Sequence, residues 1–411
     1  MQTISCRFCG TSLHRTFVDL GVSPLANAYV EPKELQRMEP FYPLRVYVCD
    51  ACYLVQLEEY QSPEQIFGDY AYFSSYSDSW LQHARDYTAH MIARFAFDAS
   101  SQIVEIASND GYLLRYFKER GMAVLGVEPA RNVAEVAIEA GIPTLIEFFG
   151  THTARSLAAQ GKHADLLLGN NILAHVPALN DFIMGMKILL KPQGVITMEF
   201  PHLLCLMKSN QFDTIYHEHF SYFSFIVVEK IFAKHGLTVF DVKELPTHGG
   251  SLRIYTCHAE DASKALTHRV QELRSRELRH GFNELATYTT FAEQVQATKR
   301  ALLAFLITAK QEGKAVVGYG APAKGNTLLN YCGIRTDFLD YTVDRSPHKQ
   351  GRFLPGTHIP IYHPDKIKET RPDYLLILPW NLKDEIQEQM AHVREWGCRF
   401  VVPIPRVEVL E

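Results

Sequence analysis

The amino-acid sequence predicts an α/β protein with a small metal-binding module at its N-terminus. Three observations support this fold class: two C-x2-C pairs lie near the start, alternating strand and helix patterns fill the middle, and a second α/β pattern follows a helical stretch. At roughly 150 residues per domain, a chain of 411 residues has room for about three domains. We place them at residues 1–66, 67–257 and 258–411.

Four of the eight cysteines predict a zinc site in the first domain. Cys6 and Cys9 form one C-x2-C pair and Cys49 and Cys52 the other, and two such pairs place four thiolates tetrahedrally around Zn²⁺. A closed four-cysteine site has no open coordination position, so the zinc is expected to be structural. The alternative is a pair of redox sites, but neither pair opens a helix after a buried strand. The remaining cysteines are expected to be small buried side chains: Cys205, Cys257, Cys332 and Cys398.

The composition argues against a nucleic-acid or membrane partner. The chain is 47% hydrophobic and 21% charged, with 41 Lys and Arg against 46 Asp and Glu, and it has no basic run that would neutralise phosphates. The polar stretch Met1–Gly10 lacks the apolar core of a secretory signal. The longest apolar run, Ala301–Ala309, is too short to span a bilayer. We therefore expect a cytoplasmic protein.

The second domain is predicted to contain a parallel sheet covered by helices on both faces. Apolar runs that read as buried strands alternate with helical segments that start near residues 111, 130, 151 and 179. The predicted strands are Ile103–Ala107, Ala123–Glu128, Asp165–Leu168 and Val195–Phe200. Residues 258–311 are rich in Glu, Arg, Lys, Leu and Ala and predict long helices that connect to the last domain.

The turn after the first of these strands predicts an adenosine-containing ligand with a positive charge. In doubly wound sheets the ligand lies over the carboxyl ends of the strands, and Glu128, which ends the next strand, is suited to accept ribose hydroxyls. The G-x-G-x-x-G fingerprint is absent, and Glu105 and Asp110 would repel a pyrophosphate. They suit a cation such as S-adenosylmethionine (SAM). The alternative is an α/β domain without a cofactor.

The pattern E-x-A-x-N-x-G over residues 105–111 resembles motif I of the class I methyltransferases, with Ala107 in place of the usual glycine. Leu168–Asn171 resembles the strand end that lies beneath the methionine part of SAM, and Leu189–Gly194 resembles the turn before the fifth strand. This resemblance implies a class I SAM methyltransferase domain. The expected SAM contacts are Glu105, Ala107, Ser108, Asn109, Gly111, Glu128, Asn170 and Asn171.

A second cluster, residues 215–224, concentrates two His, one Glu and two Tyr after the last of these strands. If the segment is extended, Tyr216, Glu218 and Tyr222 share one face and His217 and His219 the other. Imidazole titrates near neutrality and is the natural base for removing a carbon-bound proton. A metal site and ordinary structural histidines are the alternatives.

The last domain opens with a strand, a glycine turn and a helix start, a weak Rossmann-like fingerprint. Lys324 beside the turn offers a charge for a diphosphate, and Asp344 occupies the position of a ribose-binding acid. The H-G-G-S-L-R stretch, residues 248–253, either contacts diphosphate through Arg253 or serves only to shape the turn. A Rossmann-like domain used only for packing is the alternative. The expected substrate contacts are His248, Arg253, Gly318, Gly320, Lys324, Asn326 and Asp344.

The order of these motifs along the whole chain resembles the nucleotide-sugar C-methyltransferases. Members of that family act on 4-keto-deoxysugar nucleotides and include C3 methyltransferases that make branched deoxysugars. The resemblance implies an N-terminal zinc-binding domain, a central SAM domain and a C-terminal Rossmann-like domain that helps to hold the sugar nucleotide. SAM and structural Zn²⁺ are the implied cofactors.

The same resemblance implies the catalytic residues. His219 would be the base, assisted by Tyr216 and Glu218, with Tyr70 and His175 lining the sugar pocket. The C4 ketone acidifies the hydrogen on the neighbouring carbon, His219 removes it, and the enolate attacks the methyl group of SAM. Tyrosine hydroxyl or imidazolium donors would stabilise the enolate oxygen, and the sequence does not rank Tyr216, Tyr222 and His175 for that role.

The remaining alternatives concern the reaction and the partners. Methylation at C5 uses the same enolate from the other side of the ketone, and an NAD-dependent oxidoreductase would use the C-terminal glycine turn. A zinc-ribbon module that binds RNA or protein is the third possibility. We expect a small-molecule nucleotide sugar as the partner, with the nucleotide unspecified, and a monomer or small homo-oligomer.

Overall fold

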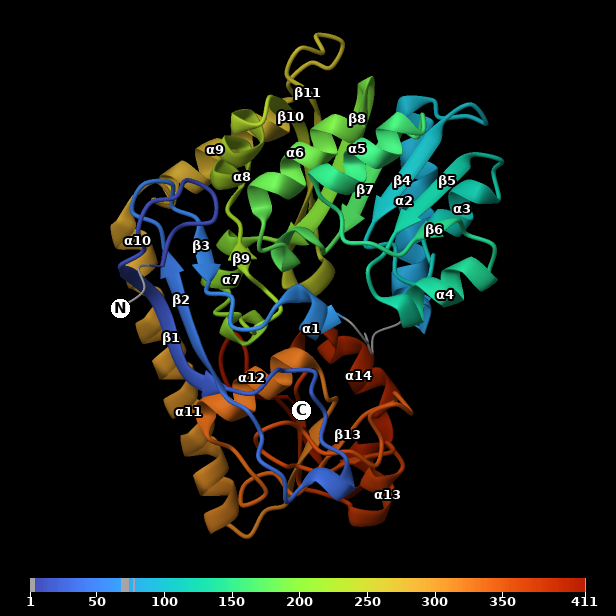
Figure 1. Cartoon of the computed structure of the whole chain (residues 1–411). Helices are drawn as coiled ribbons and strands as arrows, with labels where there is room; N and C mark the ends of the chain where they lie inside the picture. The colour runs from blue at the N-terminus through green and yellow to red at the C-terminus, as the bar shows by residue number, and fades with distance from the viewer. Residues whose placement is uncertain (1–3, 68–73, 77, 411) are drawn as a thin grey trace. The chain divides into compact units, whose positions relative to one another are not determined.

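The computed structural model describes residues 4–67, 74–76 and 78–410 (Figure 1). Contacts divide the chain into two compact units, each made of segments that lie apart in the sequence. The first unit consists of Met1–Leu13, Cys49–His202 and Phe220–Asn283, and the second of His14–Val48, Leu203–His219 and Glu284–Glu411. Parts of the first predicted domain therefore belong to both units, and the domain boundaries at residues 66 and 257 stay a prediction.

The first unit is built on a mixed sheet with the strand order β10-β11-β8-β7-β4-β5-β6. The strands from β8 to β6 in this order are parallel, and β11 and β10 extend the sheet in the antiparallel sense. The sequence predicts four of these strands, and the structure confirms them. The bounds are β4 (Gln102–Ile106), β5 (Ala123–Val127), β6 (Thr144–Leu145), β7 (Ala164–Asn170), β8 (Leu190–Pro201), β10 (Leu237–Leu245) and β11 (Ser251–His258).

Helices cover this sheet, which explains why its central strands are continuous apolar runs. Leu166, Leu167 and Leu168 of β7 are all fully buried, as expected for a parallel strand with both faces covered. Figure 1 shows α5 and α6 side by side in front of the sheet. The helices of the unit are α1 (Pro63–Phe67), α2 (Asp78–Phe95), α3 (Leu114–Lys118), α4 (Arg131–Glu139), α5 (Thr151–Ala159), α6 (Leu179–Leu189), α8 (Phe225–Lys234) and α9 (His268–Arg279).

The cysteine pairs also lie in the first unit. Gly10 follows the first pair with φ +78°, the left-handed conformation that glycine adopts without steric cost. After the second pair, β3 (Val55–Leu57) pairs in the antiparallel sense with β9 (Ser221–Tyr222). The second knuckle is thereby joined to the segment that carries Tyr222.

The second unit contains the Rossmann-like sheet, with the strand order β14-β13-β12-β15-β16-β17. All neighbouring strands are parallel except β16 and β17. The glycine turn joins β12 to helix α12, as the sequence predicts. The bounds are β12 (Val316–Tyr319), β13 (Thr342–Val343), β14 (Ile361–Tyr362), β15 (Tyr374–Ile377), β16 (Arg399–Val402), β17 (Glu408–Leu410), α12 (Ala323–Cys332), α13 (Lys366–Thr370) and α14 (Lys383–Gln389).

A β-hairpin and a long helix complete the second unit. Strands β1 (Arg15–Ser23) and β2 (Tyr42–Val48) are antiparallel, and β1 packs against α11 (Phe291–Gln311). The Phe17 and Phe291 rings stack with their centroids 4.7 Å apart. The unit also contains α7 (Leu203–Lys208) and α10 (Leu285–Thr289).

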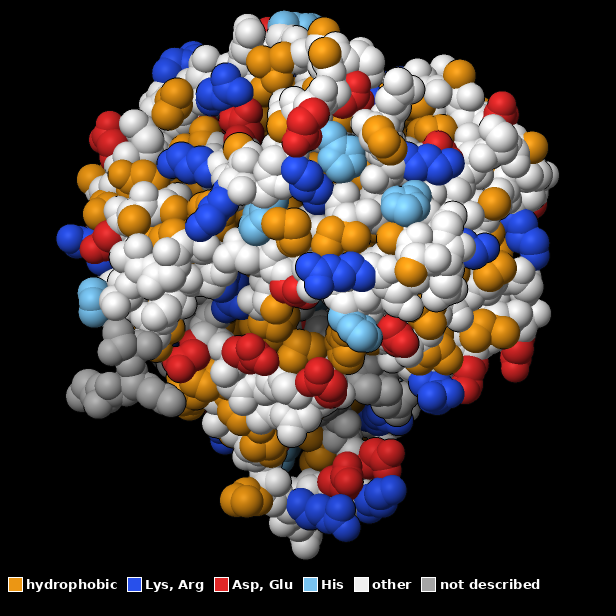
Figure 2. All heavy atoms as spheres, turned by 45° about the horizontal axis from the view of Figure 1, so that its top comes forward, with side chains coloured by type: hydrophobic (Ala, Val, Ile, Leu, Met, Phe, Trp, Pro, Cys, Tyr) orange, Lys and Arg blue, Asp and Glu red, His pale blue; other side chains and the backbone are white. Residues whose placement is uncertain are grey.

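The surface carries a mixture of charges, as the similar numbers of basic and acidic residues lead one to expect. Figure 2 shows basic and acidic side chains interspersed over one face. Within the described ranges, no helix is both long enough and apolar enough to cross a membrane.

Candidate active site

The four cysteines of the two knuckles converge on one point. Their sulfur atoms all lie within 4.8 Å of one another, with Cys6 Sγ 3.6 Å from Cys52 Sγ and Cys9 Sγ 3.5 Å from Cys49 Sγ. Zn–S bonds of about 2.3 Å in tetrahedral geometry place neighbouring sulfurs about 3.8 Å apart. The donor set and its spacing therefore fit Zn²⁺, and the predicted ligands are brought together.

Side chains around the knuckles connect them to the elements of the seven-stranded sheet. Gln56 Nε2 donates to Cys6 Sγ over 3.1 Å, and its Oε1 accepts the backbone N–H of Arg7 over 2.9 Å. The Arg7 guanidinium donates to the Pro177 carbonyl over 3.2 Å, and Asn180 Nδ2 donates to the Arg7 carbonyl over 3.1 Å. The first knuckle therefore holds the loop between β7 and α6.

The turn after β4 has the backbone geometry of a ligand-binding turn. Ala107 and Asn109 have φ of +56° and +49°, and Gly111 has φ of +75°. Glu128 Oε2 accepts the Asn109 N–H and its Oε1 accepts the Ala130 N–H, each over 2.9 Å. Glu128 therefore holds the turn through two backbone hydrogen bonds, and it also lies where a ribose-binding acid is expected. Burial raises the pKa of its carboxyl.

Glu105 carries the strongest signal for an absent ligand. Its side chain is fully buried, and among the described residues neither carboxylate oxygen has a hydrogen-bond partner. Burial, assisted by Asp110 and Glu128, raises the pKa of Glu105 well above its ordinary value. Ser108 Oγ, Asp110 Oδ1 and Asn170 Oδ1 are also buried without a partner in the described part of the chain. These acceptors fit the amino, hydroxyl and sulfonium groups of SAM.

Two aromatic rings and a histidine lie beside the carboxyl end of β7. Asn171, with φ +58°, donates through Nδ2 to His248 Nε2 over 3.0 Å. The Trp80 ring lies 5.6 Å from His248 and stacks on Tyr112 at 6.1 Å, measured between centroids. The structure thus brings His248, expected to contact substrate, to Asn171, expected to contact SAM. Trp80 and Tyr112 were not predicted from the sequence.

Ala107 is the residue that departs from the motif I pattern, and its left-handed backbone conformation is expected to lower the stability of the fold. A left-handed conformation costs a residue with a Cβ atom roughly 1–2 kcal/mol, whereas glycine adopts it freely. We expect Ala107→Gly to raise the free energy of unfolding by about 1 kcal/mol, after allowing for the larger entropy of glycine in the unfolded chain. Denaturant unfolding checks this, with Ala123→Gly as control at a strand position where glycine destabilises. A loss of stability in Ala107→Gly would contradict it.

The histidine cluster does not follow an extended path. The short 3-10 helix Phe212–Thr214 precedes it, and the His219 N–H donates to the Tyr216 carbonyl over 2.9 Å, which closes a turn. The Tyr216 and His219 rings therefore lie in contact, tilted by 33° with centroids 4.1 Å apart. An extended segment would place these two side chains on opposite faces. In the structure they lie against each other instead.

A backbone hydrogen bond fixes the ring of His219. Its Nδ1 lies 2.8 Å from the Thr214 carbonyl oxygen, which can only accept, so Nδ1 carries the hydrogen. In the neutral ring, Nε2 then bears the basic lone pair. His217 is held in the same way through its other ring nitrogen, since its Nε2 lies 3.2 Å from the Pro43 carbonyl, and burial lowers its pKa. The choice of His219 as the base therefore stays a prediction.

Glu218, the predicted assistant of His219, is a buried carboxyl. Its side chain accepts a hydrogen bond from Asn27 Nδ2 over 2.6 Å. Burial raises the pKa of Glu218 to about 7, although the bond from Asn27 opposes this shift. Asn27 was missed in the sequence, because it lies 191 residues from Glu218 and in no motif.

The other predicted catalytic residues lie in the first unit or outside the described residues. His175 ends the 3-10 helix Leu173–His175 after β7, and Tyr222 lies on β9. The Phe220 N–H donates to the Ala174 carbonyl over 2.7 Å, so the structure brings these two segments together. Tyr70 lies outside the described residues.

Several polar groups of the C-terminal glycine turn have internal partners, whereas Asn326 Oδ1 is buried without one among the described residues. Asp344 Oδ2 accepts the Ala321 N–H over 2.7 Å, and Asn326 Nδ2 donates to the Ala26 carbonyl over 2.6 Å. Lys324 Nζ donates to Asn381 Oδ1 over 2.7 Å. Gly320 has φ +87°, and a Cβ atom there would lie 2.6 Å from Pro379 Cδ.

Packing also explains Gly318, where a Cβ atom would lie 2.6 Å from Thr342 Oγ1. Lys324 lies 4.6 Å from the centroid of the Trp380 ring, whose Nε1 donates to the buried Asp213 over 2.7 Å. Burial raises the pKa of Asp213 to about 6. Contacts of these residues with a sugar nucleotide stay a prediction.

Arg253 lies in a buried ion pair. It is 2% exposed on β11 and donates through Nε to Glu199 Oε1 of β8 over 2.6 Å. His83 Nε2 lies 2.9 Å from the other Glu199 oxygen. In the structure Arg253 therefore neutralises a carboxylate inside the sheet, and a diphosphate contact would compete with that partner.

Family models match most of the chain. They are described as "Putative zinc binding domain" over residues 6–67, "Methyltransferase domain" over residues 80–242 and "C-methyltransferase C-terminal domain" over residues 246–405. These matches confirm the predicted zinc module and methyltransferase domain. The order of the three also agrees with the order of motifs along the sequence.

Among known proteins, C-methyltransferase NovU from Streptomyces niveus is 36% identical over 408 residues, covering 98% of this chain and 96% of NovU. A ubiquinone biosynthesis O-methyltransferase from Bartonella tribocorum is 33% identical over 96 residues, covering 23% of this chain and 39% of that protein. A solved magnesium protoporphyrin IX methyltransferase from Synechocystis PCC 6803 with bound SAM is 14% identical at a TM-score of 0.34, covering 47% of this chain and 88% of that chain.

Proposed function

Because the chain belongs to the C-methyltransferase family that includes NovU, we propose that it methylates a carbon next to the ketone of a nucleotide-diphosphate 4-keto-6-deoxysugar. The proposed position is C3, and the product is a branched deoxysugar nucleotide. SAM is the methyl donor. The observation that carries the proposal is the orientation of His219, whose Nδ1–H bond to Thr214 makes Nε2 the basic nitrogen.

The chemistry proceeds through an enolate. His219 Nε2 takes the proton from C3, and the C–H electron pair moves into the enolate of the C4 ketone. The enolate carbon forms a bond to the methyl group, the S–CH3 bond breaks, and its electron pair stays on sulfur. SAM supplies an electrophilic methyl group on a positively charged sulfur. His219 starts neutral and ends protonated, and Glu218, the residue before it, is the predicted assistant that would stabilise its charge.

The residues of the first unit account for binding of the methyl donor. The buried acceptors of Glu105, Asp110 and Asn170 suit its hydrogen-bond donors, and its positive charge would favour the ionised form of Glu105, which burial disfavours. Glu128 remains able to accept ribose hydroxyls, because a carboxylate oxygen can accept more than one hydrogen bond. Tyr216, Tyr222 and His175 remain the candidates for donating to the enolate oxygen.

The proposal is tested with the purified protein, SAM and the 4-keto-6-deoxysugars of thymidine, guanosine and cytidine diphosphate. We expect one of them to gain a methyl group on C3, as read by NMR of the product. We also expect solvent deuterium to enter C3 when SAM is omitted, because His219 forms the enolate before methyl transfer. A methyl group on C5 would correct the position, and a methyl group on oxygen would overturn the carbon-acid mechanism.

A further inference from the structure

Asn27 is a polar residue of the N-terminal third that reaches the predicted catalytic loop. Its amide Nδ2 donates to Glu218 Oε1 over 2.6 Å, and both residues belong to the second unit. Glu218 is 4% exposed, so few water molecules are available to solvate its charge. A short hydrogen bond to a buried carboxylate is among the stronger polar interactions in proteins.

The segment that carries Asn27 is held in place on both sides of it. The Ala26 carbonyl accepts a hydrogen bond from Asn326 Nδ2 over 2.6 Å, and Tyr29 Oη donates to the Ala321 carbonyl over 2.5 Å. Val30 then pairs in the antiparallel sense with Phe353. Residues 26–30 are therefore clamped across the glycine turn between β12 and α12, and Asn27 has little freedom to leave Glu218.

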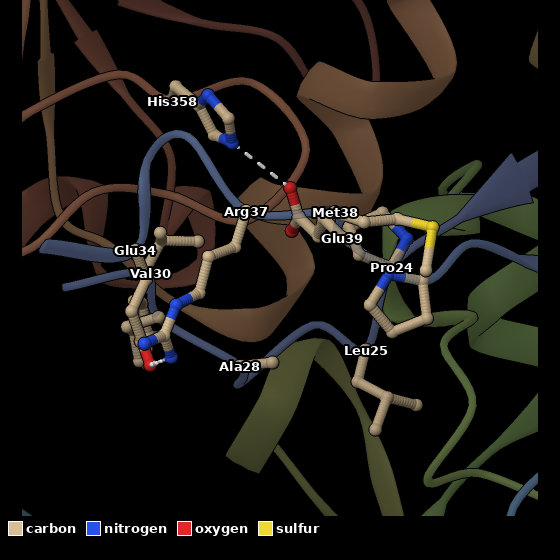
Figure 3. Close-up of a pocket in the computed structure, with 11 residues that line it drawn as sticks. Pro24, Leu25, Ala28, Val30, Glu34, Arg37, Met38, Glu39 and His358 are labelled. Atoms are coloured by element: carbon tan, nitrogen blue, oxygen red, sulfur yellow. Dashed lines mark hydrogen bonds and ion pairs between the residues drawn. The ribbon is translucent and has the colours of Figure 1, made fainter.

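The neighbours of Asn27 point elsewhere. Leu25 and Ala28 line a hollow of about 300 Å³ together with Met38, Glu39 and other side chains (Figure 3). Within that hollow, Glu39 accepts from His358 over 3.1 Å. The segment thus presents apolar side chains to the hollow and one amide donor to Glu218, an arrangement that general packing does not require.

We propose that Asn27 is a positioning residue that holds the carboxylate of Glu218, the residue before His219, in its ionised form during proton abstraction. The inference rests on the proposed function of His219. Without the amide donor, a carboxyl with this burial keeps its proton near neutral pH, and it no longer stabilises a protonated imidazole. Asn27 touches neither the substrate carbon nor SAM in this scheme, so its effect passes through Glu218.

Other ionisable groups around Glu218 do not replace this donor. On the clamped segment, the Tyr29 phenol is buried and its pKa is raised, in part by the charge of Glu218. Lys349 lies 5.3 Å from the Tyr29 ring centroid and donates to the Ala321 carbonyl. On its own loop, the neighbours of Glu218 are His217 and His219. The pKa of Glu218 is lowered by the bond from Asn27 and raised by burial.

The first test measures the Glu218 carboxyl itself. The protein is labelled with ¹³C at the glutamate carboxyls, and Glu218 is assigned from the signal lost in Glu218→Gln. In the unsubstituted protein the signal is expected to titrate with a pKa of about 7. In Asn27→Leu, which has a similar volume and no donor, the titration is expected to move to higher pH. An unchanged titration would overturn the proposal.

The second test measures kcat against pH with the best sugar nucleotide. Asn27→Leu is expected to shift the acid limb of the profile to higher pH and to lower kcat at pH 7 about tenfold, with little change in KM. Thr327→Val is the matched control, because Thr327 Oγ1 donates to the Ile215 carbonyl of the same loop over 3.0 Å without touching Glu218. We expect Thr327→Val to leave the acid limb of the kcat profile at the same pH as in the unsubstituted protein.

An equal shift in Thr327→Val would assign the effect to a loosened loop and overturn the proposal. If Asn27→Leu does not fold, as judged by its SAM affinity and circular dichroism, Asn27→Ala is measured in its place. If the unsubstituted protein methylates none of the sugars, the proposed function fails. The carboxyl titration still decides whether Asn27 controls the protonation of Glu218.

Discussion

Replacement of His219 by asparagine is expected to abolish methyl transfer to carbon while leaving SAM binding unchanged. Asparagine retains an N–H that donates to the Thr214 carbonyl, so the loop keeps the hydrogen bond that now fixes the ring. It has no basic nitrogen at the position of Nε2. General-base catalysis contributes about 10²–10⁴-fold to a rate, so kcat should fall at least by that factor.

The measurement combines product formation, SAM affinity by calorimetry and deuterium exchange into the keto sugar. His217→Asn is the matched control, because His217 contacts the Pro43 carbonyl and lies two residues away on the same loop. It is expected to keep kcat within a few-fold of the unsubstituted protein. Full methyl transfer by His219→Asn would remove His219 as the base. Retained exchange with lost transfer would place its role after enolisation.

The parallel sheet of the first unit was predictable from the sequence because both of its faces are covered. Central strands such as β7 must then be apolar along their whole length, and the helices between them begin at recognisable positions. The cysteine pairs were equally informative, since metal coordination fixes the spacing of the ligands. The signal in these cases is local, so neighbouring residues are sufficient to detect it.

The geometry of the histidine cluster was not predictable in the same way. Residues 216–220 contain no glycine or proline, so nothing local indicates the turn that brings the Tyr216 ring against His219. The loop also has distant partners, among them Asn27, whose amide donates to the Glu218 carboxylate. A sequence pattern identifies the residues that carry the chemistry, whereas their directions follow from tertiary contacts.

Arg253 shows a related difficulty. Its position after a glycine pair resembles that of a phosphate-binding residue, yet β11 is an inner strand of the sheet. Its register places Arg253 directly opposite Glu199 of β8, and the two side chains form a buried ion pair. From the sequence, Glu199 falls on a predicted strand but Arg253 in a glycine-rich turn, and the register of β11 against β8 is needed to pair the two.

Loss of the zinc ligands is expected to have the largest effect on stability. Replacing Cys49 by serine removes one of four thiolates, and structural zinc sites contribute on the order of 10 kcal/mol to the folding of small modules. We expect Cys49→Ser to lose bound zinc, as measured by metal analysis, and to unfold at a lower temperature. Cys205→Ser is the matched control, since Cys205 lies on α7 outside the cysteine cluster.

The same substitution is expected to lower methylation, because the first knuckle supports the loop that carries His175. Arg7, between Cys6 and Cys9, donates to the Pro177 carbonyl, and its guanidinium lies 5.5 Å from the centroid of the Phe220 ring. Without zinc the knuckle loses its fixed shape, and Arg7 no longer holds this loop against the segment that leads to Tyr222. Full zinc content and an unchanged unfolding temperature in Cys49→Ser would contradict the four-cysteine site. A zinc-free variant with normal kcat would show instead that the metal supports folding alone, without any influence on methylation.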